Sequence, residues 1–196
     1  MLALKRFYDA QLAEVINRMR LELDRRYTYH TVEHTLDVIK VCEEISIAEE
    51  MNEDEKLILS ISALFHDTGF LLSRSNHEER SVEIFTQARA EYTLDPLHVQ
   101  EIENCIRATR VPQEPQSHLE QIICDADLDY LGRTDFWPIS DSLFVEMTNC
   151  GEISDAVAWK NLQVRFMTAH RFHTKFSKNR RDDQLRINLD EVKSRD

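Results

Sequence analysis

The chain has 196 residues and a formal net charge of -12, from 24 lysines and arginines against 36 aspartates and glutamates. This acidity argues against nucleic acid as a partner but leaves a small anionic ligand open. Only three glycines and four prolines are present, and no stretch has the composition of a linker. We therefore expect one domain over residues 1–196.

Strand-like alternation is not sustained anywhere in the sequence. We predict an all-α fold, a single compact bundle of about eight or nine helices. The predicted helices span residues 3–25, 32–50, 54–66, 76–92, 96–109, 118–131, 138–149, 154–170 and 181–193. Three starts carry capping signals: Thr31, residues 75–78 as a capping box, and Asp95 followed by Pro96.

No apolar run has membrane-spanning length, and the first residues lack the pattern of a secretory signal. We therefore expect a cytoplasmic protein without a membrane partner. The four cysteines, Cys42, Cys105, Cys124 and Cys150, are widely spaced and form no Cys-x-x-Cys motif. This spacing favours free thiols packed in the core over a zinc knuckle or a redox pair.

The second predicted helix carries a histidine on its apolar face. His34 is followed at helical spacing by Val38, Val41, Ile45 and Ala48. This stripe predicts that the imidazole points into the core. A lone histidine on such a face is more often a satisfied core residue than a ligand, so the position needs other polar residues beside it to indicate a site.

The third predicted helix supplies such residues at its end. Residues 57–65 are apolar on nearly every face and are followed by His66, Asp67, Thr68 and Gly69, with Gly69 as the expected stop of the helix. Adjacent side chains on a regular helix diverge by about 100°. At a helix end, however, the backbone can turn both side chains toward one point, so we predict that His66 and Asp67 act together.

A further carboxylate follows in the sixth predicted helix. Asp127 shares its face with apolar residues such as Ile123 and Leu131, whereas Asp125 shares its face with Gln121. We therefore predict that Asp127 is the buried acid of the two. A buried carboxylate needs a partner, and a cation is an efficient one. Two imidazoles and two carboxylates suit a borderline or hard divalent cation with positions open to water and substrate.

These residues resemble the pattern of the HD-domain metal-dependent phosphohydrolases: a histidine, a His-Asp pair and a distal aspartate. The pattern lies in residues 29–35 (YHTVEHT), 65–69 (FHDTG) and 124–132 (CDADLDYLG). The resemblance implies an HD core over about residues 27–132, a C-terminal helical extension over 133–196, and the metal ligands His34, His66, Asp67 and Asp127. Residues 166–174 (FMTAHRFHT) also look like the tail of a poorly characterised branch of predicted HD phosphohydrolases.

The resemblance further implies a hydrolase that cleaves a phosphate monoester or diester through a metal-activated water. The substrate would be a nucleotide or another small phosphorylated molecule. Asp67 would belong to the catalytic set. His30 resembles the catalytic histidine of cyclic nucleotide phosphodiesterases and would act as general acid; alternatively, Tyr29 and His30 only anchor the loop. Because Arg107 lies in the segment where many relatives carry a histidine, we expect one divalent ion: manganese, magnesium, nickel, iron or zinc.

Candidate substrate-binding residues are His77, Arg107, Arg110, Arg171 and Lys175. The last two belong to the basic stretch 165–186, which is either a phosphate-attracting rim or a solvated helix face. Candidates for orienting the ligands are Glu33, Asp125 and Asp129. His170 is expected to pack the tail onto the core, and the capping box accounts for Glu78.

Two other functions stay open. One is a non-catalytic module that binds a metal and a nucleotide in signalling, and the other is an iron oxygenase of the HD class. A homodimer is compatible with the sequence.

Overall fold

The computed structural model describes residues 1–195, so position 196 of the predicted domain lies outside the described residues. The described chain is all-helical, which confirms the predicted fold class. The α-helices are α1 (Leu2–Glu22), α2 (Val32–Ala48), α3 (Glu53–Phe65), α4 (His77–Ala88), α5 (Pro96–Ala108), α6 (His118–Asp127), α7 (Phe136–Asn149), α8 (Ala156–Ala169) and α9 (Lys175–Ser194). Two short 3-10 helices, η1 (Thr68–Leu71) and η2 (Asp129–Gly132), follow α3 and α6.

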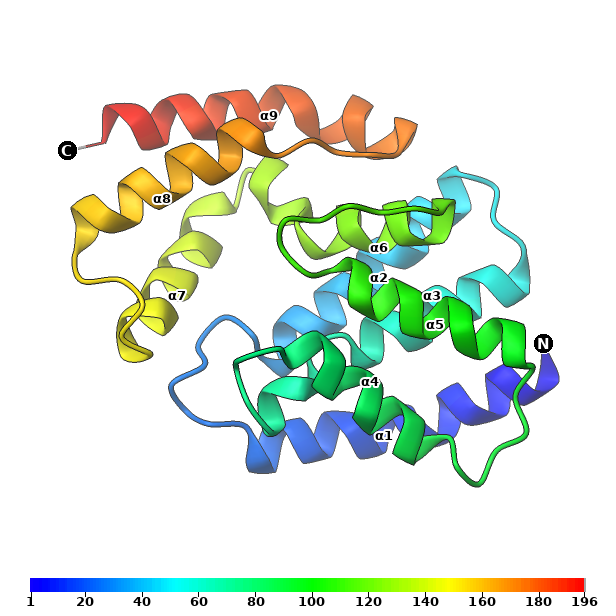
Figure 1. The fold of residues 1–196 in the computed structure, drawn as a ribbon. Helices are drawn as coiled ribbons and strands as arrows, with labels where there is room; N and C mark the ends of the chain where they lie inside the picture. Colours follow the sequence, from blue (N-terminus) through cyan, green and yellow to red (C-terminus); the bar gives the residue numbers. More distant parts are fainter. Residues whose placement is uncertain (196) are drawn as a thin grey trace.

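Helix α3 is the centre of the larger of two apolar clusters. It contacts α1, α2, α5 and α6 (Figure 1), and side chains on all its faces, such as Leu59, Ile61 and Leu64, are buried. Each fully buried aliphatic side chain contributes about 1.5–3 kcal/mol. The apolar part of α3, residues 57–65, has no polar face and is therefore stable only in this central position, as its sequence predicted.

The second apolar cluster joins α7, α8 and α9 to η2, and these helices lie to one side of α1–α6 in Figure 1. Its members include Tyr130, Phe136, Met167 and Leu185. Two buried carboxylates tie α9 to the end of α6. Asp125 accepts hydrogen bonds from the backbone N–H groups of His173 and Thr174, at 2.7 and 2.8 Å, while Asp129 forms a bidentate pair with Arg181.

Two expectations about helix starts were wrong for local reasons. Asn76 has a left-handed φ of 58° and its side chain makes no capping hydrogen bond, so the capping box expected at residues 75–78 is absent. Asp95 does cap α5, by accepting a hydrogen bond from Leu97 N. Helix α9 begins at Lys175 rather than at residue 181, because the Thr174 side chain caps it.

No helix within residues 1–195 is long and apolar enough to cross a membrane. All four cysteines are free. Cys42, Cys105 and Cys124 are buried and Cys150 is half-buried, as the sequence predicted.

Candidate functional site

The ends of three helices bring four polar side chains to one point. His34 comes from the first turn of α2, His66 and Asp67 follow the last residue of α3, and Asp127 is the last residue of α6. The Nε2 atoms of His34 and His66 lie 3.4 Å apart. Asp127 Oδ1 lies 3.2 Å from His34 Nε2 and 3.5 Å from His66 Nε2.

The Asp67 side chain also reaches this point, although Asp67 directly follows His66 in the chain. Its Oδ2 atom lies 3.4 Å from His34 Nε2 and 3.1 Å from His66 Nε2. The backbone allows this because α3 ends at Phe65, and Asp67, with φ -106° and ψ 3°, turns the chain into η1. The expected convergence of His66 and Asp67 at a helix end is therefore seen.

Gly69 has a different role from the predicted one. It lies buried inside η1 rather than at the stop of α3. A Cβ atom at this position would lie 1.9 Å from the carbonyl oxygen of His77. Gly69 thus lets the start of α4 pack directly against η1, which places His77 beside Asp67.

The donor set fits a divalent cation. His66 Nδ1 lies 2.7 Å from the Ala63 carbonyl oxygen, so Nδ1 carries the proton and leaves the Nε2 lone pair toward the other ligands. Asp67 Oδ2 is buried and has no hydrogen-bond partner. One ligand atom each from His34, His66 and Asp127 lies within 4.8 Å of the others. A cation would satisfy both the lone pairs and the unpartnered carboxylate oxygen.

The electrostatics of the cluster favour positive charge. Burial alone would lower the pKa of His66, but Asp67 and Asp127 raise it well above its usual value. Burial raises the pKa of Asp127, and the two imidazoles then lower it to about 2. Carboxylates that favour a proton on a neighbouring imidazole also favour a metal ion in its place.

The prediction that Asp127 is the more buried of the two acids was wrong. Asp125 is completely buried, whereas the Asp127 side chain is 14 % exposed. Asp125 points away from the histidines to the start of α9, where burial raises its pKa and the N–H groups of His173 and Thr174 oppose that rise. Asp127 faces the histidines, and its second oxygen accepts a 3.1 Å hydrogen bond from Gln113 Nε2.

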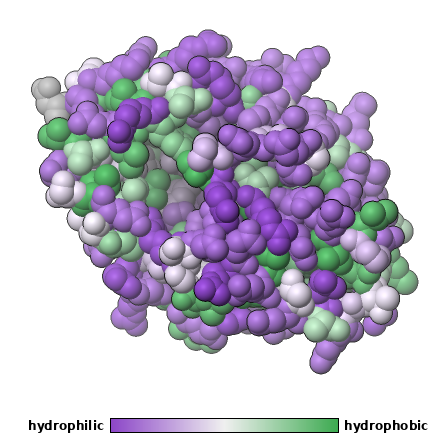
Figure 2. Space-filling model, viewed as in Figure 1, coloured by the Kyte–Doolittle hydropathy of each residue, from purple (hydrophilic) through white to green (hydrophobic). Residues whose placement is uncertain are grey.

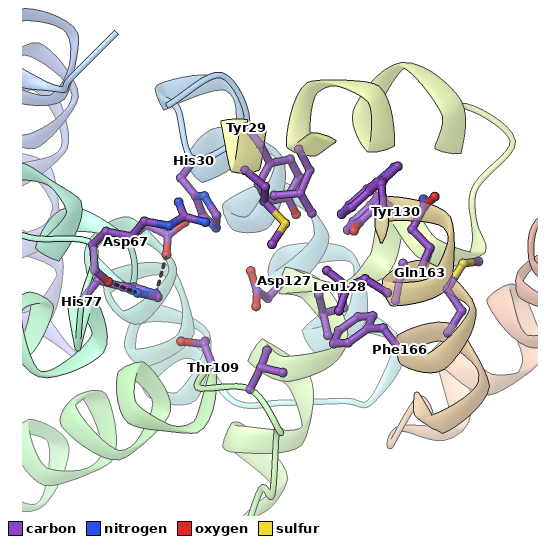
Figure 3. A pocket seen from close by; sticks show the side chains of 18 of the residues that line it. Tyr29, His30, Asp67, His77, Thr109, Asp127, Leu128, Tyr130, Gln163 and Phe166 are labelled. Atoms are coloured by element: carbon purple, nitrogen blue, oxygen red, sulfur yellow. Dashed lines mark hydrogen bonds and ion pairs between the residues drawn. The ribbon is translucent and has the colours of Figure 1, made fainter. Parts of the chain in front are cut away.

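A cavity of about 380 Å³ opens beside the cluster (Figure 3). Its polar end is lined by Asp67, Asp127, His30, His77, Arg74 and Glu78. Its other end is lined mainly by apolar residues of η2, α7 and α8. Such a concave site with a few convergent polar groups is typical of small-molecule binding.

His30 lies in this cavity and is held by a residue that the sequence analysis missed. His30 Nδ1 lies 2.5 Å from Glu146 Oε1, and Glu146 Oε2 accepts the backbone N–H groups of Tyr29 and His30. Burial raises the pKa of Glu146, and His30 and Arg74 lower it to about 2. The available signal was a carboxylate on the apolar stripe of α7 that also carries Leu143.

His77 also reaches the site. Its Nε2 atom lies 3.6 Å from Asp67 Oδ1, a contact drawn in Figure 3. Glu78 is buried and lies 3.5 Å from Arg110 Nε. The capping role expected for Glu78 was therefore wrong, because Asn76 adopts a left-handed conformation and no capping box forms.

The other candidate substrate-binding residues do not line this cavity. Arg107 pairs with Glu79 and Glu103, and Arg110 with Glu78 and Glu79. Arg171 donates to the carbonyl oxygens of Thr168 and His170, and Lys175 begins α9. Arg74, which sequence reasoning passed over, does line the cavity.

The residues expected to orient the ligands also lie elsewhere. Glu33 is exposed, and Asp129 pairs with Arg181. Burial raises the pKa of Asp129, while Arg181 acts in the opposite direction. Asp125 and Asp129 therefore hold α9 in place. Gln113, in contrast, donates directly to Asp127, one of the candidate metal ligands.

Comparisons with known proteins identify a domain family over the segment that carries the site residues. A family model described as the HD domain matches residues 31–129. A crystal structure of a predicted HD superfamily hydrolase from an uncultured Thermotogales bacterium is similar to the chain, with a TM-score of 0.62 and 21% sequence identity. The alignment covers 93% of this chain and 90% of that one, and at this identity the likeness concerns the fold. A comparison with curated proteins found no match.

Proposed function

Since the chain belongs to the HD-domain family, we propose that it is a metal-dependent phosphohydrolase that cleaves a phosphate monoester or diester of a small molecule. The observation that carries the proposal is the position of the donor cluster. Asp67 and Asp127, which lie among the candidate metal ligands, also line a cavity large enough for a small substrate.

His34, His66, Asp67 and Asp127 would hold one divalent ion. When bound, a manganese, magnesium, nickel, iron or zinc ion would lower the pKa of its water toward about 7 and polarise a phosphoryl oxygen. Gln113 and the Ala63 carbonyl keep Asp127 and His66 in the orientation that presents their free lone pairs.

His30 is proposed as the general acid for the leaving oxygen. The Glu146 carboxylate accepts the hydrogen bond from Nδ1–H, which leaves Nε2 as the ring nitrogen for proton transfer in the cavity. The phosphoryl group would meet His77 and Arg74 at the same end of the cavity. Arg107, Arg110, Arg171 and Lys175 would act only at a distance, since none lines the cavity.

Substitutions in the donor cluster test the proposal. His66→Ala and Asp67→Ala should abolish stoichiometric metal binding and phosphatase activity while the helical circular dichroism is kept. His30→Ala should keep the metal and lose about 10²–10⁴-fold in rate. The assay is phosphate release from a panel of phosphomonoesters, phosphodiesters and nucleotides with manganese, magnesium, nickel, iron or zinc.

Two results would contradict the proposal. Metal retained by both alanine variants would place the ion elsewhere. Stoichiometric metal and ligand binding without turnover of any panel member would instead favour a binding module.

A further inference from the structure

The cavity beside the donor cluster has two chemically different ends. In Figure 3, His30, Asp67 and His77 lie on one side, Tyr130 and Phe166 lie on the other, and Asp127 lies between them. Figure 2 shows the corresponding hollow, with hydrophobic residues along the side where α7 and α8 lie. The apolar lining residues are Val111, Leu128, Leu131, Leu143, Met147, Trp159, Leu162, Phe166 and Met167.

Two half-buried apolar stripes make up much of the second end. Leu143 and Met147 lie one turn apart on α7, and Trp159, Leu162 and Phe166 lie on successive turns of α8. These side chains line open volume instead of packing fully in the core. Binding of an apolar group there would remove their remaining surface from water.

The cavity is poor in available positive charge. Among the described residues that line the cavity, Arg74 is the single lysine or arginine. Arg74 already pairs with Glu146 at 2.6 Å and with Glu152 at 2.5 Å. Beyond the proposed divalent ion and the histidines, a di- or triphosphate would meet no free lysine or arginine in the lining to balance its additional charges beside Asp67 and Glu78.

The apolar end offers few hydrogen-bonding groups, chiefly the Tyr130 hydroxyl and the Gln163 amide. Gln163 Nε2 already donates to Ser140 Oγ at 2.6 Å. A nucleobase buried there would leave several of its polar atoms without partners, which is costly. An aliphatic or aromatic hydrocarbon group has no such cost.

We infer that the α7–α8 end is an apolar subsite, and that the substrate is a phosphate ester with a single phosphoryl group on a bulky apolar alcohol. The inference rests on the proposed function for its phosphoryl end. The subsite itself is testable by binding alone, without hydrolysis.

Fluorescence gives that separate readout. The chain has two tryptophans; Trp159 lines the cavity, whereas Trp137 donates to Glu191 and packs under Arg195. In a Trp137→Phe background with Mn²⁺ present, titration with butyl, hexyl and octyl phosphate should change the emission of Trp159. The Kd should fall about fourfold per added methylene, which corresponds to about 0.8 kcal/mol.

Matched variants on α8 localise the effect. Leu162→Asn should flatten the dependence of Kd on chain length, because Leu162 lines the cavity. Val157→Asn should leave it unchanged, because Val157 is exposed and does not line the cavity. Both variants should keep the metal content of the parent protein.

The outcomes separate the two proposals. A Kd independent of chain length, or tighter binding of ATP than of octyl phosphate, would overturn the apolar subsite even if phosphate is released. Octyl phosphate that binds with the expected dependence, when neither it nor any member of the substrate panel is hydrolysed, would support the subsite and contradict the proposed function.

Discussion

His30 and Glu146 lie 2.5 Å apart, from Nδ1 to Oε1, and join the loop before α2 to the last turn of α7. The same carboxylate oxygen lies 2.6 Å from Arg74, and the Glu146 side chain is fully buried. The position of α7 is therefore coupled to the orientation of His30. Since α7 also carries Leu143 and Met147 of the cavity wall, one helix connects the polar end of the cavity to the apolar one.

Glu146→Gln is expected to lower kcat by about 10- to 100-fold and to leave metal content unchanged, because the imidazole loses the carboxylate that holds it. Steady-state kinetics and metal analysis check this. Glu152→Gln is the control, since Glu152 pairs with Arg74 but makes no contact with His30. Equal losses in both variants would show that the arginine, rather than the histidine contact, matters.

Gln113→Ala should weaken metal binding by about 10- to 100-fold, because Asp127 Oδ2 would lose the hydrogen bond that orients it. Titration calorimetry with Mn²⁺ measures the change. Gln116→Ala serves as the comparison, since its exposed side chain donates to the Glu114 carbonyl oxygen and is not a partner of Asp127. Unchanged affinity in Gln113→Ala would refute an orienting role.

The two aspartates of α6 should behave in opposite ways. Asp125→Ala leaves the backbone N–H groups of His173 and Thr174 without their acceptor, so we expect a loss of about 2–4 kcal/mol in the free energy of unfolding, with metal binding retained. Asp127→Ala should abolish metal binding and change the stability of the metal-free protein less. Urea unfolding and metal analysis of both variants decide the assignment, and a reversed pattern would exchange their roles.

Protein stability should fall as the pH is lowered from about 6.5 toward 4. Burial first, and then His173 and Arg171, lower the pKa of His170 to about 4. The unfolded chain, with a pKa of about 6.5, therefore binds a proton more readily than the folded chain in this range. The contribution is complete above the unfolded pKa and is lost as pH falls through the folded pKa.

His170→Gln should reduce this dependence by on the order of 1–3 kcal/mol between pH 7 and 4. His118→Gln, at an exposed position, should retain it. Urea unfolding at several pH values measures both, and parallel curves for the parent protein and His170→Gln would exclude His170 as the cause.

The sequence by itself determined the elements whose signals are local. The stripe from His34 to Ile45 predicted an inward histidine, and the apolar run before His66 predicted a buried helix with a ligand pair at its end. These patterns depend on helical periodicity and on backbone geometry within one turn. For the same reason, the all-α fold and most helix bounds could be predicted.

Only the tertiary structure decided which polar residues meet. Asp125 and Asp127 lie on one helix, and their local surroundings could not show that Asp125 would face α9. Glu146 meets His30 across a sequence separation of 116 residues, and Arg107 and Arg110, which were predicted for the substrate, pair with nearby carboxylates. A buried charge is stable only beside its partner, and that partner is set by how distant helices pack, which periodicity within one segment does not encode.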